Sequence, residues 1–206
     1  LGDELTSVLK SIEEGTDFLK QKQILMEIGA KVLPHFAKDT TDRNRTSPFA
    51  FTGNKFEFRM PGSALSVAEP NVILNTAVAE SLNRIYEVLK DVPEEQMEEQ
   101  IQELLKSMIT QHKRILFNGN GYTDEWVEEA KKRGLFNLKS LPDALPQFIA
   151  EKNIDLFTKH RIFTKEEIYS RYEIILENYS KTIHIESLTM QDMVKKDFTP
   201  ALDRKS

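Results

Sequence analysis

Between Lys55 and Met60 the chain alternates strictly between charged and apolar residues, which is the two-residue period of a β-strand. The two faces of this strand would carry, on one side, Phe56, Phe58 and Met60 and, on the other, Lys55, Glu57 and Arg59. Residues 52–54, Thr-Gly-Asn, predict a turn, because glycine and asparagine adopt positive φ at low cost. Residues 49–51, Phe-Ala-Phe, would then form the partner strand. We therefore expect an antiparallel hairpin at about residues 49–60.

The charged face of this hairpin has two interpretations. A half-buried strand commonly exposes its polar side to solvent, so the charges could be structural and form a local ion pair. Alternatively they could form a site, since Glu57 and Arg59 are two residues apart and point the same way, with Lys55 beside them. A glutamate offers oxygen ligands to Mg²⁺ or Mn²⁺, and an arginine fork suits phosphate or carboxylate.

The rest of the chain has the three- and four-residue spacing of amphipathic helices. We expect helices over residues ~70–90 and ~94–116, a short one from the cap Thr123 to Gly134, and a segment that starts at Ser140 and is interrupted by Pro146. Thr164-Lys-Glu-Glu167 is a capping box and opens the longest helix, which Pro200 would stop. The stripes expected to be buried in the three long helices are Val72, Ile73, Val78, Leu82, Ile85, Tyr86 and Leu89; Met97, Ile101, Leu104, Leu105, Met108, Ile109 and Leu116; and Ile168, Tyr172, Ile175, Leu176, Tyr179 and Ile183, continued by Leu188 and Met193 or Val194.

Four shorter features complete the pattern. Residues 3–10 predict an N-terminal helix that Gly15 ends, and residues 24–28 fit either a strand or a helical turn. Residues 118–122, Asn-Gly-Asn-Gly-Tyr, predict a tight turn between helices, because no Gly-Lys-Ser/Thr follows as in a phosphate loop. His160 and His184 lack an acidic partner at metal-ligand spacing, so neither is read as a ligand.

Composition limits the class of protein. A chain of 206 residues with 39% hydrophobic residues can bury one large or two small cores. The net charge of −5 argues against a general nucleic-acid or anionic-membrane surface, and no apolar run approaches ~18 residues. The absence of cysteine excludes disulfides and thiolate metal sites and fits a cytoplasmic protein. The chain opens on Leu1-Gly2 without an initiator methionine, so we expect it to be part of a longer polypeptide.

One family shares the central motif. Residues 44–47, Asn-Arg-Thr-Ser, a short hydrophobic strand, and residues 54–61, Asn-Lys-Phe-Glu-Phe-Arg-Met-Pro, resemble the paired strands of the glutamine synthetase catalytic domain, in the form of its type III branch. Residues 66–82, 115–126, 170–173 and 185–190 are also similar to that branch, so the resemblance covers nearly the whole chain.

The resemblance implies roles for four residues. Glu57 would be a metal ligand for Mg²⁺ or Mn²⁺, and Arg59 would bind substrate glutamate and the transferred phosphoryl group. Arg45 would contact the phosphates of ATP, and so would Lys55, which stands where other branches often carry arginine. Lysine presents a point charge instead of a fork, so Lys55 departs from the usual pattern.

The resemblance also implies a fold, partners and an activity. The expected fold is mainly α (α+β), with residues 1–90 as the end of the catalytic domain, including the hairpin, and residues 91–206 as a multi-helix C-terminal bundle. The parent would make glutamine from glutamate, ammonia and ATP through a γ-glutamyl phosphate, as a homo-oligomeric ring. Further acidic ligands, a histidine, a glutamate-binding loop and a flap lie upstream in the family, so the chain would form one wall of the site and be inactive alone.

Two alternatives stay open. One is a non-catalytic helical oligomerisation or interaction module with a structural hairpin. The other is a related γ-glutamyl-amine ligase, whose amine pocket would lie elsewhere.

Overall fold

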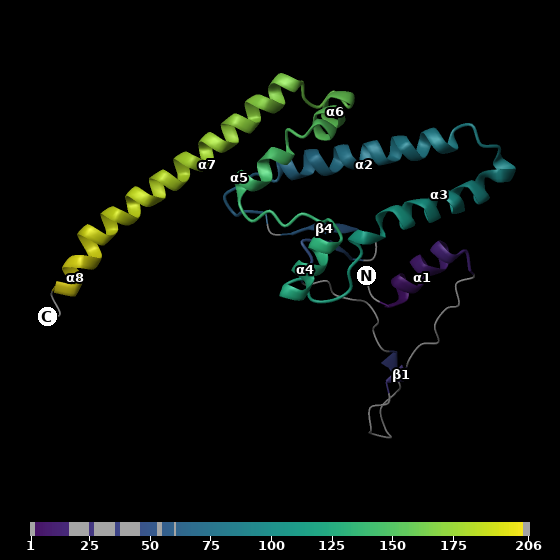
Figure 1. The fold of residues 1–206 in the computed structure, drawn as a ribbon, viewed down its shortest axis with the longest axis horizontal. Coiled ribbons are helices and arrows are strands. Elements are labelled where there is room, and N and C mark those ends of the chain that lie inside the picture. The colour runs from purple at the N-terminus through teal and green to yellow at the C-terminus, as the bar shows by residue number, and fades with distance from the viewer. Residues whose placement is uncertain are drawn as a thin grey trace. The chain divides into compact units, whose positions relative to one another are not determined.

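The computed structural model describes residues 3–16, 46–52, 55–59 and 61–203, together with the backbone of residues 25–26 and 36–37 (Figure 1). The chain divides into two compact units, each of which is described by itself. The first comprises residues 1–73 and 81–137, and the second comprises residues 74–80 and 138–206. Helices dominate both units, and a short antiparallel hairpin precedes most of them, so the expected mainly α (α+β) fold class is confirmed.

Among its described residues, the first unit contains short strands and three complete α-helices; helix α2 contributes residues to both units. Its elements are α1 (Asp3–Glu14), β1 (Leu25–Met26), β2 (Phe36–Ala37), β3 (Phe49–Phe51), β4 (Phe56–Phe58), α2 (Ala68–Leu89), η1 (Glu94–Gln96), α3 (Met97–His112), η2 (Lys113–Ile115) and α4 (Asp124–Lys132). Strand β1 pairs antiparallel with β2, which decides the open choice at residues 24–28 in favour of a strand.

Helix α1 packs against α3. Gly15 ends α1 as expected: its φ of +67° lies in the left-handed region that favours glycine, and the N–H of Thr16 donates to the carbonyl of Ser11 at 3.0 Å. Between the two helices, Lys113 Nζ lies 2.6 Å from Glu13 Oε1. These contacts hold the N-terminal helix against the helix that leads to the turn at residues 118–122.

The second unit is entirely helical in the part of the chain that the structure describes. Its complete elements are α5 (Leu141–Ala144), η3 (Leu145–Gln147), α6 (Glu151–Lys159), α7 (Lys165–Met193), the π-helical η4 (Val194–Phe198) and α8 (Thr199–Asp203). Ile168 and Phe157 are almost fully buried, and the Phe157 ring contacts Phe148 and Phe163. This small aromatic core forms where α6 and the first turns of α7 meet.

The predicted helix starts are confirmed by their caps. Thr123 and Ser140 each accept a hydrogen bond from the backbone N–H three residues later. Thr164 and Glu167 form the complete capping box at the start of α7. Gly134, with φ +69°, follows α4 as expected.

The expectation that Pro200 stops the long helix is wrong. The chain stays helical to Asp203, because the helix widens into the π-turn η4 before the proline. There the Thr199 N–H donates to the Val194 carbonyl five residues earlier, and Pro200 falls in the first turn of α8, where its missing N–H needs no partner.

The apolar stripes are covered only in part. Six members of the α2 and α3 stripes are exposed, and the other members that lie in these helices are half-buried; the exposed ones are Ile73, Val78, Leu82, Tyr86, Ile101 and Leu105. In α7 burial declines along the helix: Ile168 is buried, but Ile183, Leu188, Met193 and Val194 are exposed. The prediction of continuous buried stripes is therefore wrong, because periodicity indicates an apolar face and does not supply the element that covers it.

No helix among the described residues is long and apolar enough to cross a bilayer. The domain boundary expected near residue 90 stays a prediction. The two compact units do not test it, because α2 contributes residues to both of them. The turn at Gly53 and Asn54, the position of Met60 and the segment carrying Arg45 lie outside the described residues.

Candidate functional site

The predicted antiparallel hairpin is confirmed. Strand β3 pairs antiparallel with β4, and the facing pairs are Phe49 with Phe58, Ala50 with Glu57, and Phe51 with Phe56. At the turn, the N–H of Thr52 donates to the Lys55 carbonyl at 2.9 Å, and the Thr52 hydroxyl donates to the same oxygen at 3.3 Å. Because facing residues share a face of the sheet, Ala50 lies on the side of Glu57, and the phenylalanines lie on the other.

The charged face is the more covered one. Ala50 is 1% exposed, and the side chains of Arg59 and Glu57 are 26% and 37% exposed. On the opposite face, Phe49 and Phe56 stack with ring centroids 5.1 Å apart, yet both rings are exposed. Glu57 and Arg59 form the local ion pair that the structural interpretation expects, on the more covered face of the hairpin, so the choice between a structural and a catalytic role stays a prediction.

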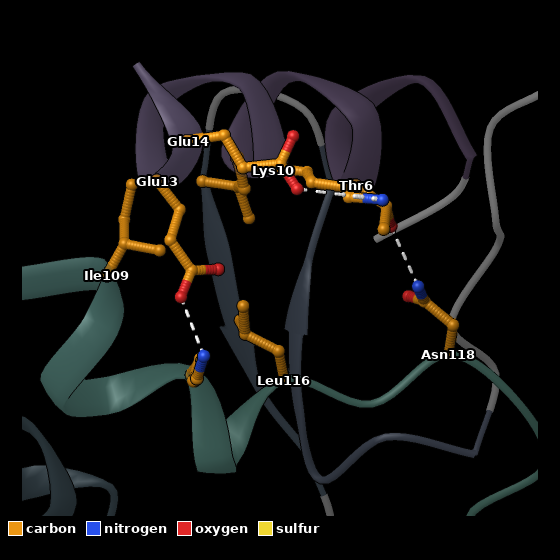
Figure 2. A pocket seen from close by; sticks show the side chains of 9 residues that line it. Thr6, Lys10, Glu13, Glu14, Ile109, Leu116 and Asn118 are labelled. Carbon is orange, nitrogen blue, oxygen red and sulfur yellow. Dashed lines mark hydrogen bonds and ion pairs between the residues drawn. The ribbon is translucent and has the colours of Figure 1, made fainter. Parts of the chain in front are cut away.

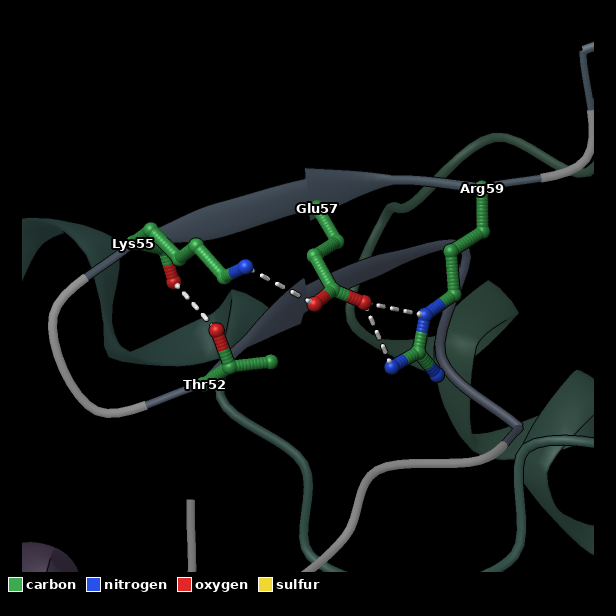
Figure 3. A network of polar contacts seen from close by, with 4 residues as sticks. All are labelled: Thr52, Lys55, Glu57 and Arg59. Carbon is green, nitrogen blue, oxygen red and sulfur yellow. Dashed lines mark hydrogen bonds and ion pairs between the residues drawn. The ribbon is translucent and has the colours of Figure 1, made fainter.

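Three of the four predicted site residues meet on this face (Figure 3). Arg59 donates from Nε and Nη2 to the same Glu57 oxygen, Oε2, at 3.2 and 3.0 Å. Lys55 Nζ lies 3.8 Å from the other oxygen, Oε1, and its side chain is 67% exposed. Glu57 is thus held between two cations, with Arg59 as the closer and less exposed of them. Arg45 lies outside the described residues, so its place relative to this cluster stays a prediction.

The cluster fits part of a metal site. Arg59 occupies Oε2, which leaves lone pairs of the Glu57 carboxylate for a hard cation that prefers oxygen. Across the residues with described positions, no group of three or more His, Asp or Glu side chains gathers closely enough to hold a metal ion. Glu57 could therefore supply one ligand, and the remaining ligands would have to come from elsewhere.

The turn at residues 118–122, which sequence analysis assigned only a connecting role, touches the segment that leads into the hairpin. The N–H of Gly121 donates to the Thr46 hydroxyl at 2.7 Å, across 75 residues of sequence. On the far side of the turn, Asn118 donates from Nδ2 to the Thr6 hydroxyl at 2.8 Å. No sequence motif predicts these contacts, because two polar residues so far apart in the sequence produce no periodic pattern.

Helix α4 braces the same turn. Arg133 donates from Nη1 to the Leu116 carbonyl at 2.8 Å, and its guanidinium lies 5.4 Å from the centre of the Trp126 ring. Trp126 in turn stacks on Phe117, with centroids 3.8 Å apart. Arg133 is itself held by Glu129 at 2.6 Å, and this hydrogen bond lowers the pKa of the Glu129 carboxyl.

A pocket of about 540 Å³ lies between α1 and the α3–η2 region (Figure 2). Leu9, Ile109 and Leu116 give it an apolar lining. Its polar groups bind one another: Glu13 pairs with Lys113 at one place and Thr6 with Asn118 at another. The pocket therefore reads as the joint between the helices, and its polar contacts stabilise that joint.

A second ionic cluster lies in the helical unit. Glu80 of α2 contacts His160 Nε2 at 2.9 Å and Lys159 Nζ at 2.8 Å. The side chains of Glu80 and His160 are 12% and 14% exposed, so the pair is well covered. The expectation that His160 is no metal ligand stays a prediction, and no sequence signal pointed to its carboxylate partner, Glu80, 80 residues away.

Comparison with known proteins identifies similar chains. A family model described as "Glutamine synthetase C-terminal domain" matches residues 100–205. The chain is 55% identical over 207 residues to a glutamine synthetase of Butyrivibrio fibrisolvens, an alignment that covers 98% of this chain and 29% of that protein. It is 45% identical over 202 residues to the type-3 glutamine synthetase of Dictyostelium discoideum, covering 98% of this chain and 28% of that protein. A glutamine synthetase of Bacteroides fragilis (strain YCH46) is 35% identical over 205 residues, covering 97% of this chain and 28% of that protein. The chain thus spans about three tenths of the length of these relatives.

Proposed function

The chain belongs to the glutamine synthetase C-terminal domain family, and from this premise we propose that it forms one wall of the active site of an ATP-dependent glutamate–ammonia ligase. The observation that carries the proposal is the Glu57–Arg59 pair on the covered face of the hairpin. Relatives that align with nearly the whole chain, hairpin included, are named glutamine synthetase, which supports the same reaction for the parent polypeptide.

The proposed chemistry joins an amine to a carboxylate in two steps. A γ-carboxylate oxygen of glutamate attacks the terminal phosphorus of ATP, the bond to the bridging oxygen breaks, and ADP leaves. The nitrogen of ammonia then attacks the acyl carbon of the γ-glutamyl phosphate, the carbon–oxygen bond to phosphate breaks, and the nitrogen loses a proton as glutamine forms. Both steps gather negative charge, which cationic side chains must neutralise.

In this scheme Arg59 binds the substrate carboxylate and the transferred phosphoryl group. Its guanidinium presents several donors in one plane, so it can keep one contact with Glu57 and direct others to phosphate oxygens. Glu57 orients that guanidinium and would supply one carboxylate ligand to Mg²⁺ or Mn²⁺. Such an ion, when bound, would polarise phosphate oxygens. Lys55, on the exposed side of Glu57, and Arg45 contact nucleotide phosphates.

We propose a cytoplasmic parent enzyme, and the family resemblance implies a homo-oligomeric ring. The chain alone carries one wall of the site and is expected to be inactive. A ligase that uses another amine in place of ammonia would employ the same Glu57–Arg59 pair, and phosphate release measured with methylamine in place of ammonia distinguishes the two activities.

One observation favours an additional role in assembly. The second half of α7 is exposed on all sides, and Ile183, Met190, Met193 and Val194 continue the stripe that is buried near its start. Such an apolar face is typical of a surface that another protein surface covers. We therefore propose that this half of α7 contributes to the contacts of the oligomer.

The deciding experiment measures glutamate- and ammonia-dependent phosphate release from ATP, with Mg²⁺ or Mn²⁺, for the complete polypeptide and for this chain. We expect activity in the complete polypeptide only. Arg59→Ala should lower kcat/KM by about 100-fold or more, because it removes a preorganised cation from the developing charge. Glu177→Gln, which breaks an exposed pair with Lys181 on α7, is the matched control for Glu57→Gln and should leave the activity unchanged.

Assembly is measured on the same variants by light scattering. Unchanged assembly with lost activity in Arg59→Ala and Glu57→Gln supports a catalytic hairpin. Altered assembly with retained activity supports the interaction module instead. Activity in the isolated chain would refute the single-wall proposal, because the remaining metal ligands would then have to lie within it.

A further inference from the structure

The close approach of Gly121 to Thr46 leaves no room for a side chain at position 121. A Cβ atom on Gly121 would lie 2.8 Å from the backbone carbonyl oxygen of Thr46 and 3.3 Å from its hydroxyl. A flexible side chain could move away from such a contact, but a backbone carbonyl moves only with its segment. The glycine therefore permits the hydrogen bond from its N–H to the Thr46 hydroxyl at 2.7 Å.

The turn that contains Gly121 is held by contacts just before it and within it. Before it, Arg133, the residue that follows α4, holds the Leu116 carbonyl, and Trp126 of α4 stacks on Phe117. Within it, Asn118 donates to Thr6 of α1. A turn anchored to two helices can hold the segment that it contacts.

The segment held by this support leads directly to the site. Two residues after Thr46, the carbonyl of Pro48 accepts the backbone N–H of Arg59 at 2.8 Å. Pro48 also precedes β3, whose Ala50 faces Glu57. A displacement of Thr46 would therefore reach the backbone of Arg59 through one intervening residue and one hydrogen bond.

We propose that Gly121 is a positioning residue for Arg59, acting through Thr46 and Pro48, so that the C-terminal helical region sets the geometry of the substrate-binding guanidinium. This inference rests on the proposed role of Arg59 in binding glutamate and the phosphoryl group. It assigns to the turn at residues 118–121 a function beyond connecting two helices.

The test uses steady-state kinetics of the complete polypeptide, with glutamate and ATP varied separately. Gly121→Ala should lower kcat/KM for glutamate by about 100-fold, since displacements near 1 Å in a catalytic group have effects of this size. Thr46→Val, which removes the hydroxyl acceptor, should lower it by about tenfold, and Thr46→Ser, which keeps the hydroxyl, should restore it. KM for ATP should change less than threefold in every variant. The matched control is Gly62→Ala, whose Cβ would meet only the movable Leu65 side chain and should leave both parameters unchanged.

The outcomes separate this inference from the proposed function. Loss of glutamate kcat/KM in Gly121→Ala and Thr46→Val, with recovery in Thr46→Ser, supports it. Equal losses in Thr46→Val and Thr46→Ser indicate general misfolding and overturn it. Wild-type kinetics of Gly121→Ala beside an inactive Arg59→Ala overturn the inference alone, whereas an active Arg59→Ala overturns the proposed function and this inference with it. If Gly121→Ala fails to fold, the comparison of Thr46→Val with Thr46→Ser decides.

Discussion

Exchange of Arg133 for lysine tests whether the guanidinium stabilises the turn at residues 118–122. The lysine keeps the positive charge near Glu129 but lacks the planar guanidinium, which contacts both the Leu116 carbonyl and the Trp126 ring. The contacts removed are the 2.8 Å hydrogen bond to the Leu116 carbonyl and the guanidinium placement 5.4 Å from the Trp126 ring centre. Attraction to Glu129 survives in part and is not counted.

The expected loss follows from these two contacts. A hydrogen bond from a charged donor contributes about 1.5 kcal/mol, and a partly exposed cation–π contact contributes about 0.5–1 kcal/mol. Together they predict that the free energy of unfolding of the first unit falls by about 2 kcal/mol. With a urea dependence of about 2 kcal/mol per molar, the midpoint should fall by about 1 M.

The chain supplies its own probe. Trp126 is the single tryptophan, and it stacks on Phe117 at 3.8 Å, so its fluorescence reports on this joint as urea increases. Arg114→Lys makes the same exchange at an exposed position nearby and should leave the midpoint unchanged. Equal fluorescence midpoints for Arg133→Lys and Arg114→Lys would refute the bracing role of the guanidinium.

Three further predictions concern the second unit. Phe157→Ala should lower its free energy of unfolding by about 3–5 kcal/mol, read from helical ellipticity in urea, because the ring is 2% exposed; a change below about 1 kcal/mol would contradict the assigned core. Glu80→Gln removes the carboxylate that contacts His160 and should lower the free energy of unfolding by about 1 kcal/mol, and the double variant with His160→Gln should show no further loss if the two residues act as a pair. Hydrogen bonds from the backbone and then the side chain of Thr164 lower the pKa of Glu167 below its ordinary 4.5. This stabilisation is therefore present above pH 4.5 and is lost as the pH falls through the folded pKa, so Glu167→Gln should flatten the dependence of the melting temperature on pH between 7 and 3; an unchanged pH profile would count against the capping box.

Local sequence signals predicted the local structure well. The helix starts at Thr123, Ser140 and Thr164 were predicted because capping is decided within four residues. The antiparallel hairpin was predicted from the alternation of residues 55–60 and the turn residues before them. The expectation at Pro200 was wrong because a proline predicts a helix end, whereas the sequence does not show that a π-turn before it lets the helix continue.

Long-range features could not be predicted in this way. The contacts of Thr46 with Gly121 and of Glu80 with His160 join residues at least 75 positions apart, and single polar residues carry no periodicity. The half-covered α7 shows the same limit for apolar residues: the stripe from Ile168 to Val194 is continuous in sequence, yet only its beginning finds partners within the chain's described residues. Periodicity defines a face, and burial depends on what packs against it.

The hairpin joins both kinds of information. Alternation assigns Glu57 and Arg59 to one face of the hairpin, but it does not show whether that face is exposed to solvent or buried. The small Ala50 opposite Glu57 is 1% exposed, so the carboxylate and the guanidinium lie beside a region that excludes much of the water. There the mutual pairing of Glu57 and Arg59 offsets the unfavourable desolvation of each charge and keeps both oriented before any substrate binds. Because electrostatic attraction grows as water is excluded, a phosphoryl group that reaches Arg59 on this face would be bound more strongly than one at the exposed Lys55. This difference in coverage is the physical reason to expect that loss of the charge at Arg59 impairs the proposed reaction more than loss of the charge at Lys55.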